Sequence, residues 1–462
     1  MGEAKMIWGI LVLGLILRLI SINQSFWLDE ATSISVAGDM SFSQILNQFS
    51  PGDFHPPFYY FLLKIWVTVF GVSEVGARSL SIIVGLATIF IVYLIGKEIK
   101  NRKVGLLSAA LLATSGLHVY YSQEARMYIL STFLVTLLVY LFLKLQKEAK
   151  NWQWILFSLT LAANSLTDYL PNLIILVFWF YALIVKKNAS WWKKFILSHL
   201  ALVFVWAFWF KTFLTQLGAG LTVKANVPVW WNVLGRTTFK QVFLIPVKFM
   251  IGRISFVNKK IYALVVGIFA AFFGFLIVKS TKYFKETKIV WSWFFIPIVI
   301  SALIGLRLSV FSYFRLIFAL PAFYLIIALG LINLRKKWFI PAVVFVLAVN
   351  FLTTSIYLFT PRFYKEDWRG MVSFVEKESV GKNAITLFVA DSQMEAYKYY
   401  SKDAKIAGPT GLSEDLDLIW LMRYVQPMFD PEDKLRQEVE DLGYQKTGEF
   451  DFNKVVVWRY EK

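Results

Sequence analysis

The chain has 462 residues, of which 58% are hydrophobic, 18% aromatic and only 17% charged. This balance argues against a soluble enzyme, because soluble domains of this length carry far more charge. The formal net charge of +18 does not indicate nucleic-acid binding, since residues 361–462 hold 15 Lys or Arg against 19 Asp or Glu and all the excess basic charge precedes them. No cysteine is present, so disulfides and thiol chemistry are excluded.

Eleven apolar segments predict membrane-spanning helices, and we expect the first to be retained rather than cleaved. They cover residues 6–22, 78–95, 104–120, 128–143, 154–168, 170–185, 195–210, 261–278, 289–306, 314–333 and 338–359. Lys and Arg cluster in every second connecting loop, which predicts that these loops and the N-terminus face the cytoplasm. An odd number of spans then predicts an extracytoplasmic C-terminus in a multi-pass protein of the cytoplasmic membrane.

Two long outer segments interrupt the spans. The first, 23–77, has no Lys or Arg before residue 58 and contains an apolar helix of about four turns at 58–70, which we expect to lie along the interface. The second, 211–260, combines eight Lys or Arg with Trp and Pro. A basic and aromatic segment of this kind is typical of an interfacial anchor, and it is also able to cover a site at the membrane surface.

From residue 361 the pattern becomes that of a soluble domain. Strands are predicted at 383–390, 416–425 and 454–460, and helices at 394–401 and 431–442. The predicted fold class is therefore a polytopic α-helical membrane protein (1–360) with a small C-terminal α/β extracytoplasmic domain (361–462). This domain lacks histidine and a Gly-rich phosphate loop, so we expect no separate catalysis in it.

Adjacent carboxylates, Asp29 and Glu30, follow the first span in the sequence WLDEA. They are either solvated loop acids or a partly desolvated pair in which one carboxylate accepts a proton from a hydroxyl. His55 lies in the same outer loop, before two prolines that fix an extended entry into the helix at 58–70.

Other polar residues are predicted at the outer ends of spans. They are Tyr121, Glu124, Arg126, Asp168, Tyr169, Tyr313 and Arg315. An arginine at this level either anchors to lipid headgroups or clamps a phosphate group through two parallel hydrogen bonds. Taken together, the residues predict a reaction between a lipid phosphate held by arginine and a hydroxyl activated by aspartate.

A series of motifs then carries a family resemblance. In chain order they are WLDEA, HPPFYYFLLKIW, GVSEVGARSLS, YYSQEARMY, TDY, SYFRLIFALPAFYL and YKEDWRGMVSFVEK. Their order resembles the GT-C class membrane glycosyltransferases related to protein O-mannosyltransferases and to the lipid A aminoarabinose transferase. The resemblance implies transfer of a sugar from a polyprenyl-phosphate donor on the outer membrane face, with inversion at the anomeric carbon.

The resemblance also implies roles for individual residues. Asp29 is the expected base, with Glu30 beside it, and Arg126 and Arg315, with Tyr121, are expected near the donor phosphate. The acceptor or supporting residues are His55, Glu124, Asp168, Tyr169 and Tyr313. No cofactor is required, although an oxygen-rich site formed by Asp29, His55, Glu124 and Asp168 leaves a divalent metal open.

The expected partners are a polyprenyl-phosphate-linked hexose or pentose, membrane lipid, and an acceptor hydroxyl on a protein, lipid or glycan. Nucleic acid is not among them. One alternative is an oligosaccharyltransferase or polymer ligase that uses a polyprenyl diphosphate. A flippase or transporter is another, but transporters usually place polar sites near the midplane and often show repeats. Here the polar clusters lie at the ends of spans, and the sequence shows no internal repeat.

Overall fold

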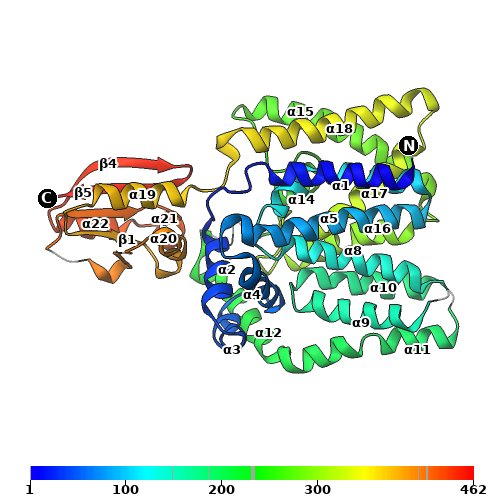
Figure 1. The fold of residues 1–462 in the computed structure, drawn as a ribbon, viewed down its shortest axis with the longest axis horizontal. Coiled ribbons are helices and arrows are strands. Elements are labelled where there is room, and N and C mark those ends of the chain that lie inside the picture. The colour runs from blue at the N-terminus through cyan, green and yellow to red at the C-terminus, as the bar shows by residue number, and fades with distance from the viewer. Residues whose placement is uncertain are drawn as a thin grey trace.

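The computed structural model describes residues 2–147, 149–185, 187–229, 231, 235–403, 405–412 and 415–462. It consists of a large helical part, in which most long helices run along the long axis, and a small α/β domain at one end (Figure 1). The helices of the large part are α1 (Glu3–Leu19), α2 (Leu28–Asp39), α3 (Phe42–Gln44), α4 (Phe58–Phe70), α5 (Glu74–Ile99), α6 (Arg102–Ala113), α7 (Gly116–Ser122), α8 (Tyr128–Leu145), α9 (Asn151–Ser165), α10 (Leu173–Ile184), α11 (Ala189–Leu197), α12 (Leu200–Asn226), α14 (Phe239–Ile251), α15 (Lys259–Ser280), α16 (Lys288–Ile304), α17 (Leu320–Ile332) and α18 (Lys336–Phe359).

Among the described residues, five helical segments are long and apolar enough to cross a membrane, or six if the bent pair α6 and α7 counts as one span. The five are α5, α8, the segment Ala189–Thr222 that joins α11 and α12, the segment Lys259–Tyr283 that begins with α15, and α18. Each of the eleven predicted segments does contain helix. The count of eleven spans is nevertheless not confirmed, because several of these helices are shorter than the roughly 20 residues that a bilayer core requires.

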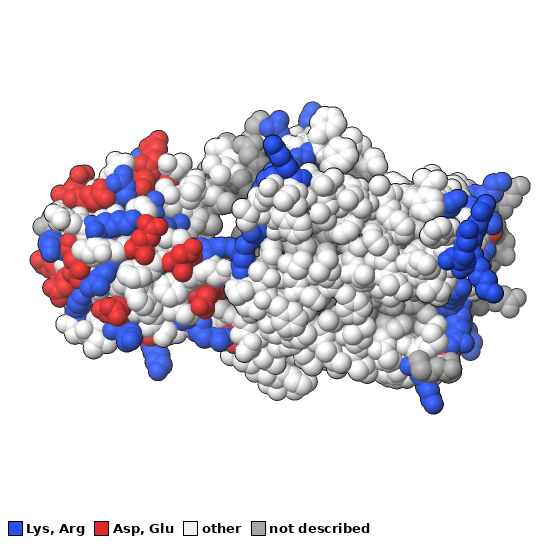
Figure 2. Space-filling model, turned by 90° about the horizontal axis from the view of Figure 1, so that it is seen from above, with Lys and Arg blue, Asp and Glu red and all other residues white. Residues whose placement is uncertain are grey.

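Charge is distributed unevenly over the helical part. A broad surface without charged residues separates the C-terminal domain from a band of Lys and Arg at the far end (Figure 2). We call this far end the basic end, and the end that carries the C-terminal domain the domain end. At the basic end, acids are paired with lysines: Glu3 with Lys97 at 2.9 Å and Glu286 with Lys100 at 2.6 Å.

A break between α6 and α7 shapes the interior of the helical part. The two helices meet at 62°, which leaves carbonyl groups at the end of α6 without helical donors. Arg18 of α1 donates to the Ala113 carbonyl at 3.1 Å, to Ser122 Oγ at 3.1 Å and to His118 Nδ1 at 2.6 Å. The short α7 then ends at Ser122, which places the following loop, 123–127, near the first turn of α2.

The C-terminal domain contains a five-stranded sheet in the order β2-β1-β3-β5-β4. Its strands are β1 (Ala384–Leu387), β2 (Ile406–Ala407), β3 (Leu418–Met422), β4 (Gln445–Phe452) and β5 (Val455–Glu461), of which the first three are parallel and the last two join antiparallel. Its helices are α19 (Trp368–Glu378), α20 (Glu395–Tyr400), α21 (Gln426–Phe429) and α22 (Lys434–Asp441). Strands and helices lie at all five segments predicted from the sequence, whereas α19, α21, β2 and β4 were not predicted. Strand β4 is a polar edge strand that few apolar residues mark.

The domain is docked on the helical part through a network around Glu74, at the start of α5. Tyr400 donates to Glu74 at 2.6 Å and accepts from the Phe26 backbone at 2.7 Å, and Arg369 also pairs with Glu74. Tyr399 donates to the Val72 carbonyl at 3.0 Å. These contacts fix the C-terminal domain beside α2, where the first predicted acids lie.

Candidate functional site

Asp29 lies in the first turn of α2, where a carboxylate is favoured by the partial positive charge of a helix N-terminus. Its side chain is 41% exposed, and its Oδ2 lies 3.6 Å from Nη2 of Arg126. Arg126 also donates to Ser33 Oγ at 3.1 Å, so it is held against α2. Two residues that the sequence assigned to base and phosphate clamp therefore lie side by side.

Glu30 has a different environment from its neighbour. It is completely buried, and Arg78 of α5 binds both of its oxygens, at 2.8 and 2.6 Å. The Ala125 backbone N–H donates to Glu30 Oε1 at 2.7 Å. Burial by itself raises the pKa of Glu30, but the charges of Arg78 and Lys365 outweigh this effect and lower it. Glu30 is thus an ionised group that binds α2, α5 and the loop 123–127 together, and it does not face solvent.

Glu124 and Lys365 complete the buried charge cluster. Lys365 Nζ lies 3.5 Å from Glu30 Oε2 and 3.6 Å from Glu124 Oε1. Burial raises the pKa of Glu124 despite the nearby Lys365. The sequence predicted Glu124 as a supporting residue but missed Arg78 and Lys365, although both lie in motifs that carry the family resemblance.

A second group of predicted residues gathers around the loop before α4. His55 Nδ1 lies 3.8 Å from Asp168 Oδ1, and Tyr60 donates to Asp53 at 2.7 Å. Helix α12 covers this loop, because its Gln216 donates to the Ser50 carbonyl at 2.6 Å. Tyr169 also contacts α12, through a hydrogen bond with Gln216 and one of 2.9 Å from Trp209.

A band of tyrosines extends from Arg126 toward the C-terminal end of α14. Tyr121 packs edge-on against Tyr120 and Tyr128, with ring centroids 5.0 and 5.3 Å apart. Tyr128 in turn packs against Phe314, next to the predicted residues Tyr313 and Arg315. Arg315 donates to the Ser309 carbonyl.

Two basic residues at the far end of this band were not singled out by the sequence. Arg253 is exposed, and its guanidinium lies 4.3 Å from the Tyr120 ring centroid. Among the described residues, none forms an ion pair or hydrogen bond with Arg253. Burial and the charges of Arg253 and Lys259 lower the pKa of Lys248 to about 8. Both residues belong to the basic segment 211–260, which the sequence did identify. Its composition does not show which of its Lys and Arg residues contact the tyrosines.

Gly252 allows Arg253 to reach this position. Its φ of +66° lies in the left-handed region, and a Cβ there would meet backbone atoms of Gly116 and Leu117 at 3.2 Å. The turn after α14 therefore packs directly on the N-terminus of α7, which carries Tyr120 and Tyr121.

The described part of the chain contains no group of three or more His, Asp or Glu side chains arranged to hold a metal ion. The four residues considered for a metal site, Asp29, His55, Glu124 and Asp168, do not form one group. Glu124 contacts Lys365, whereas His55 contacts Asp168.

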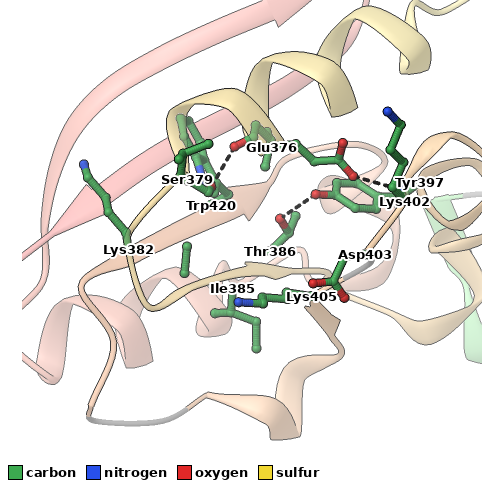
Figure 3. Close-up of a pocket in the computed structure, with 13 residues that line it drawn as sticks. Glu376, Ser379, Lys382, Ile385, Thr386, Tyr397, Lys402, Asp403, Lys405 and Trp420 are labelled. Carbon is green, nitrogen blue, oxygen red and sulfur yellow. Dashed lines mark hydrogen bonds between the residues drawn. The ribbon is translucent and has the colours of Figure 1, made fainter.

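Two cavities lie elsewhere. One of about 230 Å³ lies in the C-terminal domain between α19, β1 and the loop after α20 (Figure 3). Several of its polar groups are paired, as when Trp420 donates to Ser379 at 2.9 Å and Thr386 to Tyr397 at 3.3 Å. The other, of about 560 Å³, lies between α1 and α5 at the basic end. Neither is lined by the charged residues around Asp29.

Comparison with known proteins gives one family match and one curated relative. The model of the family "Dolichyl-phosphate-mannose-protein mannosyltransferase" matches residues 54–214, which include His55, Arg126 and Asp168. An uncharacterized protein of Aquifex aeolicus is 29% identical over 148 residues, a stretch that covers 31% of this chain and 28% of the relative.

Solved structures match over nearly the whole chain. Apo ArnT from Cupriavidus metallidurans superposes with a TM-score of 0.61 at 11% identity, over 98% of this chain and 97% of ArnT. The archaeal oligosaccharyltransferase AglB from Archaeoglobus fulgidus, in complex with an inhibitory peptide and a dolichol-phosphate, gives 0.58 at 12% identity, over 99% and 74% of the two chains. Residues 54–214 thus match the mannosyltransferase family, and the chain shares the fold of ArnT and AglB. The resemblance read from the motifs is thereby confirmed, and the small C-terminal sheet is a feature shared with ArnT.

The buried position of Glu30 gives a first prediction. Glu30→Gln keeps the shape of the side chain but leaves the buried Arg78 without its counter-charge, so we expect a loss of about 3–5 kcal/mol in the free energy of unfolding. Asp29→Asn is the matched control, because the same chemical change at an exposed pair costs about 0–1 kcal/mol. Thermal unfolding in detergent, followed by tryptophan fluorescence, measures both. Equal stability of the two variants would contradict the role given to Glu30.

Proposed function

We propose that this chain transfers a sugar from a polyprenyl-phosphate donor to an acceptor hydroxyl at the domain end, by direct displacement with inversion. The observation that carries the proposal is an accessible carboxylate, Asp29, at one end of a tyrosine band whose other end holds Arg253, a cation that forms no ion pair with any described residue. Undecaprenyl phosphate is the ligand of an ArnT structure that matches this chain with a TM-score of 0.60, and AglB was solved with a dolichol-phosphate. Both structures support a lipid phosphate as the anion that Arg253 binds.

The donor phosphate is placed at Arg253 and Lys248, with Arg315 as a further cation. Polyprenyl phosphate leaves as an anion, so its departure needs no general acid. Preorganised cations stabilise the charge that develops on its oxygen in the transition state. Arg126, which the sequence also assigned to this clamp, is in contact with Asp29 and Ser33, and in the proposal it orients the base beside the donor.

Asp29 takes the proton of the acceptor hydroxyl as that oxygen attacks the anomeric carbon. Its partial exposure leaves room for the acceptor, whereas the buried Glu30 supports the turn on which Asp29 lies. In the proposal Tyr121, Tyr169, Tyr313, His55 and Asp168 support the sugar and the acceptor, since aromatic rings offer apolar faces with a polar tip. The donor sugar is a hexose or pentose, and the acceptor is a protein, lipid or glycan.

We further propose that the basic end faces the cytoplasm and the domain end faces outward, in a multi-pass protein of the cytoplasmic membrane. The positive-inside rule supports this orientation, because the band of Lys and Arg lies at the end of the helical part that holds the N-terminus (Figures 1 and 2).

Asp29→Asn tests the base. The variant keeps the shape of the side chain but cannot accept a proton, so the transfer rate should fall by about a hundredfold or more. Affinity for undecaprenyl phosphate should survive, because the phosphate is held elsewhere. Transfer is measured with labelled undecaprenyl-phosphate hexose and membranes of the source organism as acceptor pool. A folded Asp29→Asn protein with the parental rate would remove Asp29 as the base.

Arg253→Ala tests the phosphate site. A lost charge-assisted hydrogen bond to phosphate costs about 1.5–3 kcal/mol, so the dissociation constant for undecaprenyl phosphate should rise by roughly ten- to a hundredfold. Arg253→Lys should recover part of the affinity, because lysine keeps the charge but not the planar fork. Arg335→Ala, which removes an exposed arginine from the residue before α18, is the control. Unchanged binding by Arg253→Ala would place the phosphate elsewhere.

The lowered pKa of Lys248 predicts that the binding of undecaprenyl phosphate depends on pH. With a pKa of about 8 Lys248 is charged below that pH and neutral above it, and a bound phosphate favours the charged form. The second pKa of a phosphate monoester is about 6, so the ligand does not change charge between about pH 7.5 and 9.5. The affinity for undecaprenyl phosphate should therefore fall several-fold over this range, measured by microscale thermophoresis. Lys248→Met should bind less tightly at the lower pH and show a flatter profile; a parental profile in Lys248→Met would contradict the assignment.

A further inference from the structure

Lys365 lies in the motif YKEDW, where the chain passes from α18 into the C-terminal domain. Its side chain is only 2% exposed, and Nζ lies 4.8 Å from the Tyr120 ring centroid. The backbone is held from both sides, since its N–H donates to Gln24 Oε1 at 2.8 Å and its carbonyl accepts from Asn453 at 2.6 Å. Gln24 belongs to the helical part and Asn453 to the turn between β4 and β5, so Lys365 is fixed where the two parts meet.

The ammonium group balances the charge of the cluster. Glu30 is already neutralised by Arg78, whereas Lys365 is the one cation of the described residues within ion-pair distance of Glu124. Lys365 Nζ has no hydrogen-bond partner within the described structure, and Glu124 Oε2 has none either. An ammonium ion placed between two carboxylates at about 3.5 Å without a direct hydrogen bond acts through its charge on both.

The two carboxylates belong to the two segments that form the proposed site. Glu30 directly follows Asp29 in α2, and Glu124 lies two residues before Arg126 in the loop 123–127. We propose that Lys365 is a positioning residue: by joining Glu30 to Glu124 it fixes Asp29 relative to Arg126, so that the docked C-terminal domain completes the site for sugar transfer. This inference rests on the proposed function for the role of Asp29, but the geometry it predicts is measurable without transfer.

The experiment compares two full-length variants. Lys365→Met removes the cation that favours the ionised form of the buried Glu124 and should lower the unfolding temperature. Lys365→Met with Glu124→Gln removes one charge of each sign, so it should recover stability without recovering the connection between the two segments. Lys398→Met is the control, since it removes an exposed Lys–Glu pair from the same domain.

Hydrogen exchange gives the readout that does not need transfer. In the double variant, peptides that cover 26–34 and 121–128 should exchange faster than in the parent at equal unfolding temperature, while Lys398→Met matches the parent. Parental exchange in these peptides would overturn the proposal. If the unmodified protein transfers no sugar, the proposed function is contradicted. Faster exchange in the double variant would still support the role of Lys365 in fixing the two segments.

The kinetic readout separates positioning from stability. The double variant should show a kcat lower by about tenfold or more, because small displacements of reacting groups cost this much, with KM for undecaprenyl-phosphate hexose unchanged. A purely stabilising lysine predicts that kcat returns with stability. A double variant with parental stability and parental kcat would therefore exclude Lys365 as a positioning residue.

Discussion

The buried pair of Glu30 and Arg78 is the interaction on which the domain end depends. Arg78 binds both oxygens of Glu30 and donates its remaining N–H groups to the carbonyls of Ile22, Gln24 and Ser25. A buried ion pair is maintained only when all its donors and acceptors are satisfied, and here the Ala125 N–H and Lys365 complete the set. The pair therefore fixes α2, α5 and the loop 123–127 in one arrangement, with Asp29 at its edge.

Inside the helical part, too, buried polar groups are satisfied by hydrogen-bond partners. A broken helix inside a membrane protein is tolerated where other groups satisfy its free carbonyls. Arg18 does this for the break between α6 and α7, and Gln123 ties the end of α7 to the carbonyls of Arg18 and Ile20. The break is thus coupled to the start of the site, because the residues after it are those that meet Glu30 and Asp29.

The two ends of the helical part differ in where their acids and cations lie. At the basic end, Glu3, Glu98 and Glu286 each contact a lysine, which suits an anchoring surface. At the domain end, Arg253 faces tyrosines and Lys248 is partly buried beside it, so positive charge remains available for an anion. In the proposed mechanism, Arg253 and Lys248 bind the phosphate, and the buried acids support the turn that carries Asp29.

The sequence by itself determined the fold class, the helical segments and five elements of the C-terminal domain, because apolar runs and alternation reflect local burial. It also drew attention to Asp29, Arg126 and Glu124. Tertiary structure decided that adjacent acids have opposite environments, since burial of Glu30 depends on Arg78 from another helix. It alone brought Lys365 to Glu124 and Arg253 to Tyr120, contacts between residues more than a hundred positions apart that no local pattern encodes. Span number was also beyond the sequence, because hydropathy locates apolar segments but not where each helix starts, bends and ends.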